Sequence, residues 1–164
     1  MSNHYAPRDD FSLWTLFSGS SGNAVYLRAG TDAILIDVGC SARTTVEALA
    51  RAGATPESLG GIFITHEHID HVRGLPVFSR RCDAPIHAAE GSASYLGCPA
   101  ARLTVHTPLF SADVGCIHLQ SFPTPHDSHM SVGYLIDTPY YKIGLATDLG
   151  YLSDELMTAL AACD

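Results

Sequence analysis

The feature that most constrains this chain is a run of ligand-type side chains directly behind a short apolar segment. Residues 60–65, "GGIFIT", are typical of a buried strand. The side chains that follow within six positions are those of His66, His68, Asp70 and His71. In extended backbone, residues two apart point to the same side, so His66 and His68 face together while Glu67 points away and is assigned no ligand role. This pattern predicts a metal centre at the end of a strand.

The ligand types indicate which metals would suit this cluster. An HxHxDH spacing differs from HExxH and can divide its ligands, with the first two histidines on one ion and Asp70 and His71 on a second. Imidazole and carboxylate together suit zinc or manganese, with iron as a further option. The five cysteines are far apart and form no CxxC pair, which argues against a disulfide scaffold and a thiolate zinc finger and favours a reducing compartment.

Two further candidates each follow a predicted strand. His126 comes after a proline-rich turn, and Asp148 ends a strand that is expected to be buried on both faces. A buried aspartate is costly unless it is paired or bound to metal. The alternative for Asp148 is that it caps the turn marked by Gly150. Asp127 and His129 are interpreted as polar loop neighbours of His126.

The rest of the pattern predicts an α/β sandwich forming one domain over residues 1–164. Strands are expected at residues 11–17, 24–29, 33–39, 60–65, 84–88, 102–106, 109–114, 116–122, 131–137 and 141–148. Helices are expected at residues 41–53, 73–82, 89–97 and 153–163. The chain stops just after a helix, where an α/β arrangement would normally continue with a strand, so we expect the domain to be incomplete at its C-terminal end.

Charge and hydropathy narrow the function classes. The net charge of −8 disfavours a broad phosphate-binding surface, although two divalent ions would return four positive charges. Histidines are as numerous as lysine and arginine together, at nine each, which indicates metal before phosphate. Without an apolar leader or a run of transmembrane length, the sequence predicts a cytoplasmic protein with no membrane partner.

Several segments together resemble a known family. "SGSSGNAVYLRAG", "ILIDVGCS", "ITHEHIDHVRGL", "PTPHDSHMSVGYLI" and "ATDLGYLSDEL" are similar to the YycJ/WalJ-like exonuclease branch of the metallo-β-lactamase-fold hydrolases. The SGSSGN turn is the most specific of these, whereas HxHxDH marks only the superfamily. The resemblance implies a metallo-β-lactamase-type αββα sandwich, of which this chain would be the N-terminal portion.

The resemblance also implies a division of the ligands. It places His66, His68 and His126 on one metal and Asp70 and His71 on the other, with Asp148 bridging and Asp37 supporting the site from behind. Asp70, His71 and Asp148 would be the catalytic set. The family tends to have a proline near Ser131, and a further histidine ligand for the second metal lies in the part that this chain lacks. Self-association, or pairing with the missing C-terminal segment, is therefore expected.

The predicted chemistry is hydrolysis. Two metal ions roughly 3.5–4 Å apart bridge a water and lower its pKa, and the hydroxide attacks phosphorus or a carbonyl carbon. The residues themselves do not choose the substrate; the resemblance implies a phosphodiesterase that acts as a 5′-exonuclease on DNA. The alternatives are another hydrolase on the same site, with a small cyclic phosphodiester or a thioester as substrate, and a non-catalytic metal-binding module.

The turn "SGSSGN", residues 18–23, has two interpretations. Its glycines and small polar residues can present backbone N–H groups as an anion-binding nest, or simply join two strands of a hairpin. The resemblance places this turn beside the opening of the metal site, which predicts that Ser20, Ser21 and Asn23 contact a substrate phosphate.

Overall fold

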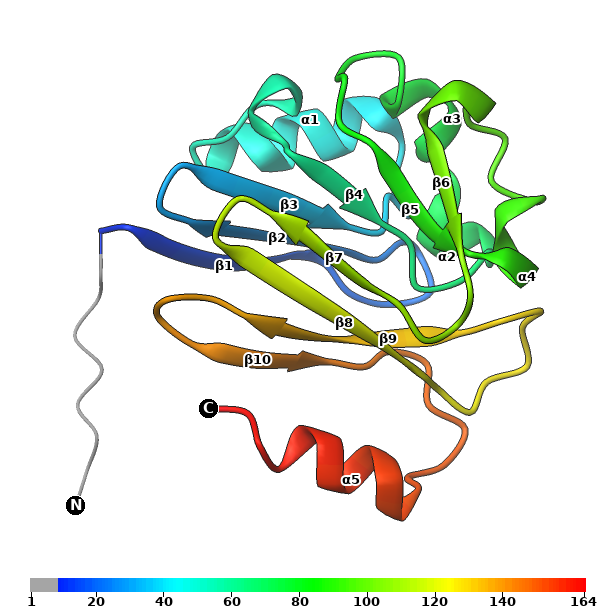
Figure 1. Ribbon diagram of the computed structural model, residues 1–164. Helices are drawn as coiled ribbons and strands as arrows, with labels where there is room; N and C mark the ends of the chain where they lie inside the picture. The colour runs from blue at the N-terminus through cyan, green and yellow to red at the C-terminus, as the bar shows by residue number, and fades with distance from the viewer. Residues whose placement is uncertain (1–8) are drawn as a thin grey trace.

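Two β-sheets stacked face to face form the centre of the molecule (Figure 1). The structure, a computed structural model, describes residues 9–164 apart from the side chain of Glu155. One sheet contains, in spatial order, β1 (Phe11–Phe17), β2 (Ala24–Ala29), β3 (Asp32–Ile36), β4 (Gly61–Phe63), β5 (Ile86–Ala89) and β6 (Leu103–His106). The other contains β10 (Lys142–Leu145), β9 (Val132–Asp137), β8 (Ile117–Pro123) and β7 (Ser111–Val114).

Helices cover the outer faces of both sheets. The helices are α1 (Ala42–Arg51), α2 (Ile69–Val72), α3 (Leu75–Phe78), α4 (Glu90–Ala93) and α5 (Asp154–Leu160), with short 3₁₀ turns at Pro56–Ser58 and Ala100–Arg102. Figure 1 shows α1 and α3 over the six-stranded sheet and α5 beyond the four-stranded sheet. The layers therefore follow the order αββα, which confirms the predicted sandwich.

Strand direction decides where the loops meet. In the six-stranded sheet, β1, β2 and β3 pair antiparallel, while β3, β4, β5 and β6 pair parallel. The carboxyl ends of neighbouring parallel strands lie at one edge of a sheet, which is where α/β folds bring their functional loops together. The segments that follow β3, β4 and β5 consequently start beside one another.

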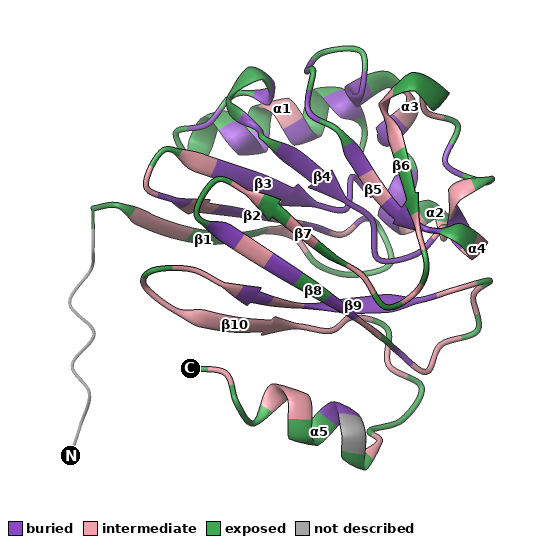
Figure 2. Cartoon of the chain, in the orientation of Figure 1, coloured by how far each residue is buried: buried purple, intermediate pink, exposed green. Residues whose placement is uncertain are grey.

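The core is divided into two layers by the alternation of side chains along each strand. On β3, Ala33 and Leu35 pack toward the helices, whereas Ile34 and Ile36 pack between the two sheets. Figure 2 shows the resulting buried strands in the centre of the six-stranded sheet. Full burial of one such aliphatic side chain contributes about 1.5–3 kcal/mol.

Most predicted elements are present, but several boundaries are corrected. The strand predicted at residues 33–39 ends at Ile36 because Asp37 adopts a positive φ of 61°. The strand predicted at residues 141–148 ends at Leu145 and is half-buried along its length, so the expectation that it is buried on both faces was wrong.

The helix boundaries are corrected as well. The helices predicted at residues 73–82 and 89–97 shrink to the four-residue α3 and α4. The longer α1 and α5 begin where the sequence predicted, because Ser41 and Ser153 cap them by accepting a hydrogen bond from a backbone N–H of the first turn. Within residues 9–164, no helix has the length and apolar character needed to cross a membrane.

Candidate metal centre

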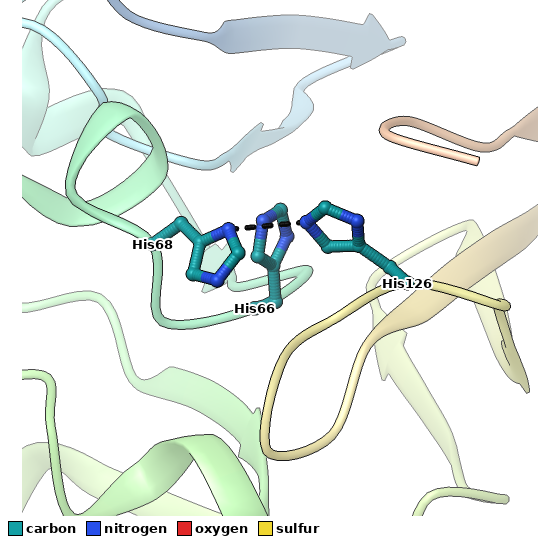
Figure 3. A group of neighbouring side chains, drawn as sticks. All are labelled: His66, His68 and His126. Atoms are coloured by element: carbon teal, nitrogen blue, oxygen red, sulfur yellow. Dashed lines mark hydrogen bonds between the residues drawn. The ribbon is translucent and has the colours of Figure 1, made fainter. Parts of the chain in front are cut away.

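Three imidazole rings converge beyond the end of β4. His66 lies three residues after Phe63, the last residue of β4, His68 is the N-cap of α2, and His126 sits in the loop after β8. Their ring centroids are 4.7, 4.7 and 4.8 Å apart, and the rings point toward a common centre (Figure 3). Nε2 of His126 lies 3.0 Å from Nδ1 of His68. This arrangement brings imidazole nitrogens from two distant segments to one point.

His66 carries the clearest sign of a ligand. Its side chain is fully buried, and its Nε2 has no hydrogen-bond partner among the described residues. Burial lowers the pKa of His66 to about 4, with added repulsion from His71, His126 and His68, so this imidazole is neutral near pH 7. A buried polar atom without a partner costs about 1–3 kcal/mol. A metal ion held by Nε2 would satisfy it, and the neutral ring is the form that binds metal.

A second group of donors shares His66 with the first. Among residues 9–164, two sets have ligand atoms that all lie within 4.8 Å of one another: His66, His68 and His126, and His66, His71 and Asp148. In the second set, Oδ2 of Asp148 is 2.7 Å from Nε2 of His71 and 3.5 Å from Nε2 of His66. Asp148 therefore contacts His71 and lies near His66, the residue that the two sets share.

Asp70 lies beside the second set without being part of it. Its Oδ2 is 3.7 Å from Nε2 of His71, and its side chain is only partly exposed. The amide of Asn23 lies between them, with Nδ2 at 3.2 Å from Asp70 Oδ2 and 3.0 Å from His71 Nε2. The structure thus places the side chains of Asp70 and His71 close to each other, with Asn23 as an additional neighbour.

The two aspartates on either side of His71 have unusual backbones. Asp37 and Asp148, with φ values of 61° and 52°, are the non-glycine residues with positive φ among residues 9–164. Asp37 Oδ2 lies 2.8 Å from Nδ1 of the ring, and Asp148 Oδ2 contacts Nε2. Non-glycine residues in this region store strain that the surrounding structure must hold, and such strain clusters at functional sites. His71 is thereby fixed from both ring nitrogens.

Asp37 also anchors the strand that delivers the histidines. Its two carboxylate oxygens accept hydrogen bonds from the backbone N–H of Thr65 (2.8 Å) and from the Thr65 hydroxyl (2.7 Å). Burial alone would lower the pKa of His71, but the hydrogen bond and charge of Asp37, with Asp148 and Asp70 nearby, raise it. A positive charge is therefore favoured at this position, whether a proton or a metal ion supplies it.

The turn predicted as an anion nest or a hairpin joins β1 to β2, which pair antiparallel. Ser20 and Ser21 are exposed, as substrate contacts require, but several polar groups of the turn are already used inside the protein. Gly19 N–H donates to Oδ1 of Asn23, and Asn23 N–H donates to the carbonyl of Asp70. Asn23 consequently connects the turn to the metal centre. The sequence had instead predicted that Asn23 contacts a substrate phosphate.

Close backbone packing at Gly39 holds these segments in place. A Cβ at Gly39 would overlap the carbonyl oxygen of Asp70 and crowd the backbone nitrogen of Asn23. Gly39 N–H in turn donates to the carbonyl of Asn23 at 2.9 Å. The segment after β3 can therefore lie against the turn and α2 only because this residue has no side chain.

Glu67 has a role that the sequence interpretation did not find. Its carboxylate belongs to neither donor set and accepts hydrogen bonds from the backbone N–H of His129 (2.8 Å) and the hydroxyl of Ser92 (2.7 Å). Partial burial would raise the pKa of Glu67, but these two hydrogen bonds lower it. Glu67 thus fixes the loop that carries His126, while Asp127 contacts the other ring nitrogen of His126 at 3.1 Å. The signal available in the sequence was its position, since Glu67 is a charged residue between His66 and His68 just after an apolar strand.

Comparison with curated proteins identifies relatives over most of the chain. Residues 18–162 match the Metallo-beta-lactamase superfamily. The exodeoxyribonuclease YycJ of Bacillus anthracis is 34% identical over 146 residues, covering 86% of this chain and 55% of that protein. The exodeoxyribonuclease WalJ of Streptococcus pneumoniae serotype 2 is 32% identical over 153 residues, covering 89% of this chain and 57% of that protein. The chain thus spans little more than half the length of these relatives.

Solved structures show the same architecture at low sequence identity. The Rm3 metallo-beta-lactamase has a TM-score of 0.65 at 20% identity, covering 91% of this chain and 70% of that one. MEM-A1, a subclass B3 metallo-beta-lactamase from a soil metagenome library, has a TM-score of 0.64 at 17% identity, covering 79% and 61%. Such identities establish the fold alone, whereas the family match covers most of the sequence. The chain belongs to the metallo-beta-lactamase superfamily.

Proposed function

We propose that this chain is a dinuclear-metal phosphodiesterase that acts on DNA as a 5′-exonuclease. The observation that carries the proposal is the buried, unpartnered Nε2 of His66 facing two further imidazoles and a carboxylate. The exodeoxyribonuclease names of the two curated relatives support DNA as the substrate. The arrangement of donors supports two metal ions, with zinc or manganese as the species that suit imidazole and carboxylate together.

The residues divide into two ligand sets in this proposal. His66, His68 and His126 hold one ion, and Asp70 and His71 hold the other with Asp148 between them. Because His66 can serve only one ion at a time, the second ion relies mainly on carboxylates and His71. We expect the three-histidine site to keep its ion through gel filtration, and the second site to fill only at higher metal concentration.

Bound divalent ions at such a site supply Lewis-acid activation of water and neutralise charge on a phosphate. The protein orients the donors: Asp37 keeps a proton on Nδ1 of His71, which leaves Nε2 available, and Asp127 orients His126 from its far nitrogen. Donors that are already fixed need no reorganisation when substrate binds, and this preorganisation stabilises the charge that develops in the transition state. In this proposal Asp70, His71 and Asp148 form the catalytic set beside the reacting phosphate.

The first test is metal content after substitution of His68. In His68→Ala, one of three neutral ligands is lost, and we expect most of the tightly held metal to disappear in elemental analysis. The matched control is His118→Ala, because His118 is a partly exposed histidine that pairs with Asp113 away from the centre. Wild-type metal content in His68→Ala would refute the ligand assignment.

The second test is activity on defined substrates. The metal-loaded chain, taken from a single gel-filtration peak whose mass reports self-association, is incubated with single-stranded DNA and with 5′-phosphorylated duplex DNA. We expect mononucleotides released from the 5′ end, with loss of activity in His68→Ala. Intact DNA together with hydrolysis of a thioester or a small cyclic phosphodiester would overturn the DNA assignment. Metal binding with none of these activities would support a non-catalytic module instead.

A further inference from the structure

A hollow of about 640 Å³ opens directly beside the metal centre. Its lining residues are Glu67, His68, Tyr95, Asp127, Ser128 and His129. His68 belongs to this hollow and to the three-histidine set, so whatever occupies the hollow lies next to the proposed metals. The metal centre as described uses none of Tyr95, Ser128 and the ring of His129.

Two aromatic rings form a parallel pair in this hollow. Tyr95, in the turn after α4, stacks on His129, in the loop after β8, with ring centroids 4.4 Å apart and planes inclined by 8°. The Tyr95 ring offers a large aromatic face, and the residue is 55% exposed. An exposed aromatic ring with a flat neighbour at an active-site mouth is the kind of surface on which nucleobases stack.

The pair is held in place by hydrogen bonds and by close packing of α4 against the loop. Glu67 accepts the His129 N–H, and the Ser92 hydroxyl lies 2.7 Å from Glu67 and 2.9 Å from the carbonyl of Met130. A Cβ on Gly91 would lie 2.6 Å from Cβ of Met130, so α4 approaches the loop as closely as a glycine allows. The two rings are therefore arranged before any ligand arrives, which lowers the entropic cost of binding.

The charge of the lining selects the ligand class. Two of the six lining residues, Glu67 and Asp127, carry carboxylates, and none is a lysine or arginine. Such a surface repels a phosphate but accepts a flat, uncharged ring, and carboxylates can accept hydrogen bonds from the exocyclic amino groups of bases. The phosphate of a nucleotide would then lie toward the metals and its base toward the hollow.

We propose that the Tyr95–His129 pair is a stacking site for the nucleobase adjacent to the phosphodiester that is cleaved. The inference rests on the proposed function, since it assumes a nucleic-acid substrate at the metal centre. A base bound in this hollow is unstacked from its neighbouring base and unpaired from the opposite strand, so the end of the substrate is single-stranded when it binds.

The test compares binding of two short 5′-phosphorylated oligodeoxyadenylates, one normal and one with an abasic first residue. Both carry a 3′ fluorophore and a phosphorothioate at the first linkage to slow cleavage, and affinity is read by fluorescence anisotropy. We expect the metal-loaded wild type to prefer the normal strand about tenfold, because stacking of one base on an aromatic side chain contributes roughly this factor. Tyr95→Ala should bring the ratio near one, and Tyr95→Phe should retain it.

Trp14→Ala is the matched control, because Trp14 is another exposed aromatic, 46% exposed, on the edge strand β1. It should keep the wild-type preference. Equal affinity of the wild type for both strands, or a full preference in Tyr95→Ala, would overturn the stacking site. DNA cleavage without base preference would refute only this inference, whereas a base preference without DNA cleavage would refute only the nuclease proposal.

Discussion

Replacing Asp37 by asparagine should weaken metal binding at His71 about ten- to a hundredfold while the fold persists. In the structure, Asp37 Oδ2 faces Nδ1 of His71 at 2.8 Å, which keeps the proton on Nδ1 and leaves Nε2 facing Asp148. Asparagine presents an N–H₂ group in place of Oδ2. His71 must then accept at Nδ1, and its proton moves to Nε2, the atom that a metal would need.

The cost in stability follows from the hydrogen bonds that change. Asp37 accepts from the N–H of Thr65, from its hydroxyl and from His71. Asparagine keeps the first, the Thr65 hydroxyl can reverse to accept, and the His71 contact survives only in the other tautomer, so we expect a loss of about 1–2 kcal/mol. Asp37→Ala leaves the buried Thr65 N–H and His71 Nδ1–H without partners, which costs about 2–6 kcal/mol at roughly 1–3 kcal/mol for each.

Competition against a chromogenic zinc chelator at pH 7 measures the affinity, and urea unfolding measures the stability. Long-range ¹H–¹⁵N correlation spectra report which imidazole nitrogen of His71 carries the proton. Asp113→Asn is the matched control, because it removes a histidine–carboxylate pair, with His118, from an exposed position. Wild-type metal affinity in Asp37→Asn, with the His71 proton still on Nδ1, would refute the reasoning.

Three further outcomes are expected. Gly39→Ala should displace Asp70 and lower both metal content and the unfolding midpoint, since its Cβ overlaps the Asp70 carbonyl; a variant with normal metal content would contradict this packing. In the metal-free chain, stability to urea should fall as pH drops from about 6.5 toward 4, because burial lowers the pKa of both His66 and His87 to about 4 and the unfolded chain binds their protons first, which outweighs the opposite effect of the raised pKa of His71. A flat profile there would argue against buried neutral imidazoles at His66 and His87. Ser20→Ala with Ser21→Ala should raise KM for DNA and leave metal content unchanged, whereas an unchanged KM favours a plain hairpin turn.

The sequence by itself determined the parts of the protein that depend on local pattern. The alternation of apolar residues set the faces of β3, and the serine caps set the starts of α1 and α5. The spacing of two predicted that His66 and His68 point to one side and Glu67 to the other, because the direction of a side chain in extended backbone follows from its position alone.

The tertiary structure decided how distant segments meet. His71 contacts Asp37 and Asp148, which lie 34 and 77 positions away, and His68 faces His126 across 58 positions. The positive φ of Asp37, which ends β3 early, and that of Asp148 have no local signal, since the strain is held by contacts to His71 and Thr65 that form only in the folded chain. The sharing of His66 between two donor sets, and the stack of Tyr95 on His129, likewise depend on how the two sheets pack, because register and sheet packing bring together side chains that no spacing along the chain relates.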